Sequence, residues 1–396
     1  MKIIKFQFED KSEGWKLAET SFNDSLTLLV GASGVGKTLI LKSLRQMKLI
    51  AEGKSYKGAE WNIEYIADDG TRHIWQGTFQ NHGLSDSNWR EPTDRSNYSK
   101  IEHERLEING KVIVKRDTDG ITFNEKPTQK LSPQESILNL FREEEEIKPA
   151  WKGIRKIDYT DHTFSAKPDL SFSNFDDFYF LDFCVSLMQK PECSDRLTDI
   201  RNNNNWPLVT RLFLVQEYHK DTFDLIQDHF NKIFPQVTGI NVSRLKDNDN
   251  NLVPYMKEGL FVQIQEEGVD HWIWPNRISS GMYRTLMQLC DLYLCADGTV
   301  FLIDEFENSL GINCIREITE DIISQERDLQ FIVTSHHPYI INNIDPDYWK
   351  LVTRNGGVVK THSLKDLDCD FKKSHHDTFM QLLQQEEYQT GQETRK

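Results

Sequence analysis

The chain has little of what marks membrane, secreted or zinc-binding proteins. It has six cysteines in 396 residues, and none forms a C-x-x-C pair. No stretch approaches the roughly 18 consecutive apolar residues of a membrane-spanning helix, and the first residues lack the apolar core of a signal peptide. We therefore expect reduced thiols, no disulfide framework, no membrane partner and a cytoplasmic location.

Positive charge is also scarce, with 47 Lys and Arg against 62 Asp and Glu and a net charge of −15. This balance disfavours a uniformly basic nucleic-acid-binding surface but is compatible with a local basic groove. Hydrophobic heptads are not sustained over the three or four repeats of a coiled coil. The length allows two or three domain-sized units.

A complete phosphate-binding loop is present at residues 31–38, where the pattern is Gly, four residues, Gly-Lys-Thr. The preceding apolar run predicts a buried strand, and the following residues have helical spacing. Backbone N–H groups of such a loop bind a polyphosphate, Lys37 reaches its β- and γ-phosphates, and Thr38 ligates magnesium. The predicted nucleotide-binding residues are Gly31, Ala32, Ser33, Gly34, Val35, Gly36, Lys37 and Thr38.

Two later apolar strands end in side chains suited to the same chemistry. Residues 300–303 lead into Asp304 and Glu305. Asp304 suits a magnesium shell, and Glu305 suits the general base that polarises an attacking water. The next strand leads into His336 and His337. A histidine there can hydrogen-bond a γ-phosphate and sense its loss; His336 is the preferred residue and His337 the alternative.

Small residues open a predicted helix before the acidic pair. Ser279, Ser280 and Gly281 precede an apolar segment with helical spacing, and small residues at a helix N-terminus make an anion site. Alone, this pattern is equally typical of an ordinary helix cap.

These four elements, in this order, resemble the ATP-binding-cassette class of ATPases, within it the branch of RecF, Rad50, SMC and OLD proteins. The resemblance is strongest over residues 1–45 and about 255–345. Residues 278–282 resemble a degenerate form of the class signature, and residues 308–310 resemble the loop that links the two sites of a dimer.

The resemblance implies an α/β fold, a P-loop ABC-type ATPase core with a β-rich N-terminal lobe and a helical insertion. Hairpin patterns at the start of the chain agree with such a lobe. We expect the ATPase domain at residues 1–134 and 255–396, and the mainly helical insertion at 135–254. The class also uses a glutamine in its magnesium shell; Gln134 is the preferred candidate and Gln76 the alternative.

In this class each ATP is held between the phosphate loop of one subunit and the signature serine of another. The resemblance therefore implies ATP and Mg²⁺ as cofactors, Ser279 acting in trans, and a homodimer or higher homo-oligomer. The chain lacks the long coiled coil of Rad50 and SMC proteins, and too few residues follow position 338 for the nuclease domain of OLD proteins.

What remains is a resemblance to compact ATPases of the AAA15/AAA21 type, found in bacterial antiviral and toxin–antitoxin-like systems. A PARIS-type defence ATPase, which holds a partner nuclease until a viral trigger appears, is one example. The resemblance implies a sensor or scaffold ATPase that hydrolyses ATP and controls an effector protein encoded nearby, with a viral protein as its trigger.

The alternative is an SMC- or RecF-like ATPase that binds a DNA duplex in repair or recombination. It predicts salt-sensitive DNA affinity and DNA-stimulated turnover. Candidate contacts are Lys152, Arg155, Lys156, Arg284, Lys372 and Lys373.

Overall fold

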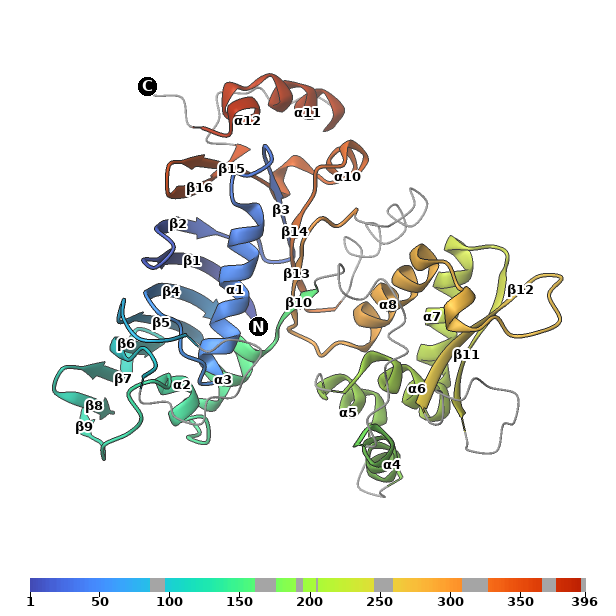
Figure 1. The fold of residues 1–396 in the computed structure, drawn as a ribbon, viewed down its shortest axis with the longest axis horizontal. Helices are drawn as coiled ribbons and strands as arrows, with labels where there is room; N and C mark the ends of the chain where they lie inside the picture. Colours follow the sequence, from blue (N-terminus) through green and yellow to red (C-terminus); the bar gives the residue numbers. More distant parts are fainter. Residues whose placement is uncertain are drawn as a thin grey trace. The chain divides into compact units, whose positions relative to one another are not determined.

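The computed structural model describes residues 1–85, 97–160, 176–189, 195–203, 206–245, 259–307, 327–364 and 375–392. The chain divides into two compact units (Figure 1). The first comprises Met1–Thr160, Gly298–Phe306 and Ile322–Lys396, and the second comprises Asp161–Asp297 and Glu307–Asp321. Within the described ranges, no helix has the length and apolar character needed to cross a bilayer.

The first unit is built on a 14-stranded sheet whose parallel part combines both ends of the chain. Four neighbouring strands run parallel to one another and to β15 (Trp349–Asn355) beside them, and three of the four are buried at every residue. Continuous apolar runs are typical of strands covered on both faces. In sheet order these strands are β10 (Ile157–Thr160), β13 (Val300–Ile303), β14 (Gln330–Thr334) and β3 (Leu26–Val30).

The sheet continues past β3 through β15 (Trp349–Asn355) and β16 (Val358–Ser363) into the β-rich lobe. Asn109 and Gly110 have φ angles of 50° and 82°, as a tight hairpin turn between β6 and β7 requires. The hairpins predicted from the sequence are therefore confirmed. The lobe contains, in sheet order, β2 (Trp15–Ser21), β1 (Lys2–Asp10), β4 (Ala59–Ile66), β5 (Arg72–Phe79), β6 (Ile101–Ile108), β7 (Lys111–Asp117), β8 (Gly120–Phe123) and β9 (Lys126–Pro127).

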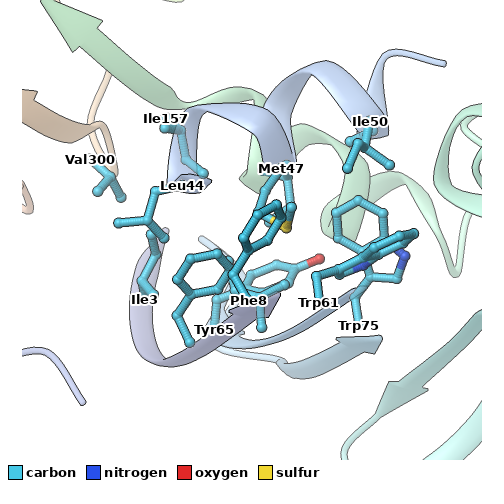
Figure 2. Close-up of a cluster of buried hydrophobic side chains, with 14 of the residues drawn as sticks. Ile3, Phe8, Leu44, Met47, Ile50, Trp61, Tyr65, Trp75, Ile157 and Val300 are labelled. Carbon is cyan, nitrogen blue, oxygen red and sulfur yellow. The ribbon is translucent and has the colours of Figure 1, made fainter. Parts of the chain in front are cut away.

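Helix α1 (Lys37–Ala51) covers one face of this sheet because its apolar residues recur at helical spacing. Figure 2 shows Leu44, Met47 and Ile50 of α1 in one cluster with aromatic side chains of β1, β4 and β5. Two shorter helices, α2 (Ile137–Leu140) and α3 (Lys148–Arg155), contact α1.

The rest of the first unit follows β14. It comprises α10 (Pro338–Asn343), the 3₁₀ turn Pro346–Tyr348, β15, β16, α11 (His375–Gln384) and α12 (Glu386–Thr390).

The second unit consists mainly of helices. Arg201 Nε and Arg211 Nη1 donate to the backbone oxygens of Tyr293 and Leu294, at 2.9 Å each. Cations at a helix C-terminus stabilise it, because the carbonyl groups there lack helical partners. Its elements are α4 (Asp176–Met188), α5 (Arg196–Asn202), α6 (Leu208–Tyr218), α7 (Lys220–Ile233), the hairpin of β11 (Val237–Leu245) and β12 (Gly259–Glu266), the 3₁₀ turn Pro275–Arg277 and α8 (Ser280–Leu294).

The architecture is α/β, with the main sheet contributed by both ends of the chain, as the sequence predicts. The division into an ATPase domain and an insertion at residues 135–254 stays a prediction, since compact units and evolutionary domains need not share boundaries.

Candidate nucleotide-binding site

Three sequence motifs meet at one edge of the parallel sheet. Leu28 of β3, Val333 of β14 and Ile303 of β13 are paired across neighbouring strands. The chain continues from β3 into the phosphate loop, from β13 into the acidic pair, and from β14 into the histidines. Parallel strands in register end at the same edge, so the motifs lie there together although roughly 300 residues separate the first from the last. Open α/β sheets bind ligands at this edge.

Three glycines allow the phosphate loop to adopt its backbone conformation. Gly31, Gly34 and Gly36 have φ angles of 146°, 83° and 105°, which side-chain-bearing residues rarely adopt. A Cβ at Gly31 would lie 2.6 Å from the backbone oxygen of Val352, and one at Gly36 would lie 2.9 Å from Val359 Cγ2. The loop therefore packs directly against β15 and β16.

Lys37 places a buried positive charge inside this loop. Lys37 is 6% exposed, and its Nζ donates to the backbone oxygens of Gly31 and Ala32 at 2.8 Å each. The fully described first turn of α1 has no acidic side chain and no side-chain cap. Its N–H groups and Lys37 together suit a polyphosphate, and the half-buried Thr38 follows at the same helix start.

The acidic pair is held by the neighbouring strand β14. Thr334 Oγ1 donates to Asp304 Oδ1 at 2.7 Å and accepts the N–H of Glu305 at 2.8 Å. The N–H of Phe306 donates to the Thr334 backbone oxygen at 3.0 Å. Glu305 has a left-handed φ of 48°, uncommon for a residue other than glycine and typical of functional turns.

The two histidines after β14 have different environments. His337 is the N-cap of α10, and its Nδ1 accepts the N–H of Tyr339 at 3.2 Å. His336 is exposed beside it. The capping bond gives His337 a structural role, and the assignment of His336 to the γ-phosphate stays a prediction.

The signature residues lie in the second unit, where Ser279 is the N-cap of α8. Ser279 Oγ accepts the N–H of Met282 at 3.2 Å. Ser279 and Ser280 are exposed and Gly281 is half-buried. The predicted helix start is confirmed, and its two serines are accessible from solvent.

The structure does not bring either glutamine to the phosphate loop. Gln76 lies on β5, six strands along the sheet from β3, in a separate hollow of about 440 Å³ on the lobe. Gln134 accepts a hydrogen bond from Ser132 Oγ at 3.3 Å. Its neighbour Glu135 lies beside Gly53, past the C-terminal end of α1. Helix α1 has 15 residues and therefore spans about 22 Å. This length separates Gln134, beyond the C-terminal end of α1, from Lys37 at its N-terminal end.

Sequence reasoning missed two parts of this edge. One is β10, whose end pairs with the end of β13; its only signal is a short alternation at residues 157–160. The other is Thr334, an ordinary strand residue in the sequence. The segment 308–310, expected to link two sites in a dimer, lies outside the described residues.

Two of the four described candidate DNA contacts form ion pairs within the chain. Arg155 pairs with Glu52 at 3.2 Å, and Lys156 pairs with Asp68. Arg284 is buried, and Lys152 is exposed. Lys372 and Lys373 lie outside the described residues.

The family described as "AAA domain, putative AbiEii toxin, Type IV TA system" matches residues 26–342, which span the phosphate loop, the acidic pair and the histidines. The chain belongs to this AAA family. No curated protein matches this AAA-family chain.

Solved structures of similar fold include heads of SMC proteins. The SmcHead bound to the C-winged helix domain of ScpA is 13% identical, with a TM-score of 0.53, over 92% of this chain and 99% of that chain. At this identity the likeness shows the fold alone, and it confirms the predicted α/β ATPase-core fold.

Two further SMC heads have lower TM-scores. The head with an extended coiled coil bound to the C-terminal domain of ScpA, from Pyrococcus furiosus, is 12% identical over 97% of this chain and 100% of that chain, with a TM-score of 0.43. The SMC head domain from Thermotoga maritima is 12% identical, covers 92% of this chain and 99% of that chain, and has a TM-score of 0.41.

Proposed function

We propose that this AAA-family protein binds ATP with Mg²⁺ and hydrolyses it at the sheet edge formed by β3, β14 and β13. The observation that carries the proposal is the register of these strands, which aligns Leu28, Val333 and Ile303. The register supports a site in which the phosphate loop and the acidic pair act on one nucleotide.

Each side chain at this edge has a task that fits its position. Lys37 and the first N–H groups of α1 neutralise the β- and γ-phosphates. Thr38 and Asp304 offer the hard oxygen ligands that Mg²⁺ prefers, and the bound ion would neutralise charge on the phosphates. Glu305 orients and deprotonates the attacking water, and His336 hydrogen-bonds the γ-phosphate.

The site is completed, in this proposal, by a second copy of the chain. Exposed Ser279 at the N-terminus of α8 supplies an anion-binding group to the nucleotide of its partner. ATP that contacts both copies binds the closed dimer more tightly than the open monomer and shifts the equilibrium toward it.

We further propose that this switch controls an effector, a nuclease or toxin encoded nearby, in a bacterial anti-phage system such as the PARIS type, with a viral protein as trigger. The family description, which mentions a toxin and a type IV toxin–antitoxin system, supports this role. Of the candidate DNA contacts, Arg155 and Lys156 form ion pairs within the chain.

The decisive test of hydrolysis is Glu305→Gln. The amide keeps the shape but cannot take the proton from water, so turnover should fall at least about tenfold while ATP still binds. The exposed Glu143→Gln is the matched control and should leave turnover unchanged. Normal turnover in Glu305→Gln would remove Glu305 from the base role, and a wild-type protein that binds no ATP would overturn the proposal.

The effector role is tested by co-purification with the products of neighbouring genes, using wild type and Glu305→Gln with ATP. We expect a stable assembly and slow basal turnover. A protein that stays monomeric and binds none of these products with ATP present would contradict the role, and strong stimulation by duplex DNA would favour the DNA-binding alternative.

A further inference from the structure

We infer that Thr334 is a positioning residue for the acidic pair and sets the orientation of both Asp304 and Glu305. Its hydroxyl is the shared partner of the Asp304 carboxylate and the Glu305 N–H, at 2.7 and 2.8 Å. This inference rests on the proposed ATPase function, because it assigns a role in that reaction.

The chemistry of the bond network fixes the direction of each bond. An ionised carboxylate only accepts hydrogen bonds and a backbone N–H only donates, so the single hydroxyl proton of Thr334 points to Asp304 Oδ1 and an oxygen lone pair faces Glu305. Thr334 is 0% exposed. Its hydrogen bond to the carboxylate is charge-assisted and partly buried, which makes it stronger than a neutral one.

The backbone of Thr334 holds the same turn from its other side. Its carbonyl oxygen accepts the N–H of Phe306 at 3.0 Å, so three successive residues after β13 are tied to one residue of β14. The left-handed φ of Glu305, 48°, is costly and persists only where surrounding contacts impose it. Thr334 supplies two of those contacts, to the N–H groups of Glu305 and Phe306.

The consequence for the reaction concerns the orientation of Asp304. The Thr334 hydroxyl binds Oδ1 and fixes the carboxylate, whose remaining lone pairs would hold the metal ion. The turn at Glu305, held by the same hydroxyl, directs the exposed carboxylate of that residue. Thr334, which is 0% exposed, would itself contact neither nucleotide nor metal.

The test compares Thr334→Val, which keeps the shape without the hydroxyl, with Thr334→Ser, which keeps the hydroxyl. In Thr334→Val we expect kcat to fall about tenfold and the Mg²⁺ concentration for half-maximal rate to rise about threefold or more. The KM for ATP should stay within about twofold, because the phosphate loop is untouched. Thr334→Ser should restore both kcat and the Mg²⁺ dependence.

Nucleotide binding and thermal unfolding are measured on each variant, and Thr334→Ala replaces Thr334→Val if the valine variant does not fold. A hydroxyl-free variant with wild-type kcat and Mg²⁺ dependence would overturn the inference, as would a Thr334→Ser variant as impaired as Thr334→Val. A wild-type protein without ATP hydrolysis would instead overturn the proposed function, so the two failures are distinguishable.

Discussion

At the scale of single residues, close packing decides which side chains are possible in the β-rich lobe. Gly77 of β5 lies opposite Trp61 of β4, and a Cβ added at Gly77 would lie 2.6 Å from Trp61 Cη2. The indole is 2% exposed and also packs against Trp75 (Figure 2). It takes the space that a side chain at position 77 would need.

We therefore expect Gly77→Ala to lower the free energy of unfolding by about 1–3 kcal/mol, because overpacking displaces a large buried ring. Urea denaturation measures the change. Gly153→Ala is the control: it lies in helix α3, and the nearest atom to its added Cβ is at 3.4 Å. That change should be neutral or stabilising by up to about 1 kcal/mol; equal effects at both sites would contradict the packing argument.

Also at this scale, a buried histidine gives the lobe a defined pH dependence. His73 is 1% exposed and stacks on Tyr65. Burial lowers its pKa from 6.5 to about 4, against a smaller opposing effect of Asp69. The unfolded chain binds this proton more readily than the folded chain, so between these two values the stability rises with pH and is lost as pH falls.

We expect the free energy of unfolding to drop between pH 6.5 and pH 4 by up to about 3 kcal/mol more in the wild type than in His73→Phe. Urea denaturation at several pH values measures both profiles. Carboxylates elsewhere titrate in both proteins, so only the difference between the profiles reports His73. Parallel profiles would show that His73 is not the group responsible.

At the scale of elements, one side chain connects two parts of the sheet that are not neighbours. Gln330, at the start of β14, is 0% exposed. Its Oε1 accepts the N–H of Ile3 at 2.8 Å, and its Nε2 donates to the backbone oxygens of Ile3 and Asn23 at 2.9 and 2.8 Å. The Gln330 side chain thus hydrogen-bonds the backbone of β1 as a neighbouring strand would, although β14 and β1 are not neighbours in the sheet.

Gln330→Leu has nearly the same volume but leaves these backbone groups without partners. We expect the free energy of unfolding to fall by about 2–4 kcal/mol, since a buried unsatisfied polar group costs about 1–3 kcal/mol. Thermal and urea unfolding measure the loss. Gln129→Leu at an exposed site should change stability by less than about 0.5 kcal/mol; a Gln330→Leu protein as stable as that control would contradict the argument.

Elements with strong local signals were predictable from the sequence. The strands β3, β13 and β14 are continuous apolar runs, each followed by a recognisable motif, and the Asn109–Gly110 turn specifies its hairpin. Strand β10 was not predictable, because its four residues become a strand only by pairing with β13.

The same limit applies to the candidate site. Its residue type made Gln134 a candidate for the magnesium shell. Its position past the C-terminal end of α1, however, depends on how the β-rich lobe packs. The role of Thr334 depends on the register between β13 and β14. Pattern and spacing contain neither kind of information, whereas the phosphate loop and the acidic pair are specified by the sequence itself.

At the scale of the whole molecule, the proposed dimer predicts that two inactive variants rescue one another. Lys37→Ala damages the phosphate loop, and Ser279→Arg blocks the signature helix start with a bulky charge. Each variant alone should lose nearly all ATPase activity. In a mixture of equal parts, half of the dimers combine both variants and each of these has one intact site, so about a quarter of wild-type activity should return.

Steady-state ATPase assays on the separate and mixed variants measure this rescue. Each variant mixed with more of itself is the control and should stay inactive. A mixture without activity, from variants that still dimerise, would show that phosphate loop and signature act within one copy.

The pairing of β3 with β14 and β15 has a consequence for how this protein is made. When β3 leaves the ribosome, the strands that flank it are roughly 300 residues from being translated, and pairing over such separations is slow. Until then its apolar residues must be shielded from aggregation. A prematurely terminated product would contain the residues of the phosphate loop but lack β14 and β15, the two strands that flank β3, so only a nearly finished polypeptide can form this edge of the sheet.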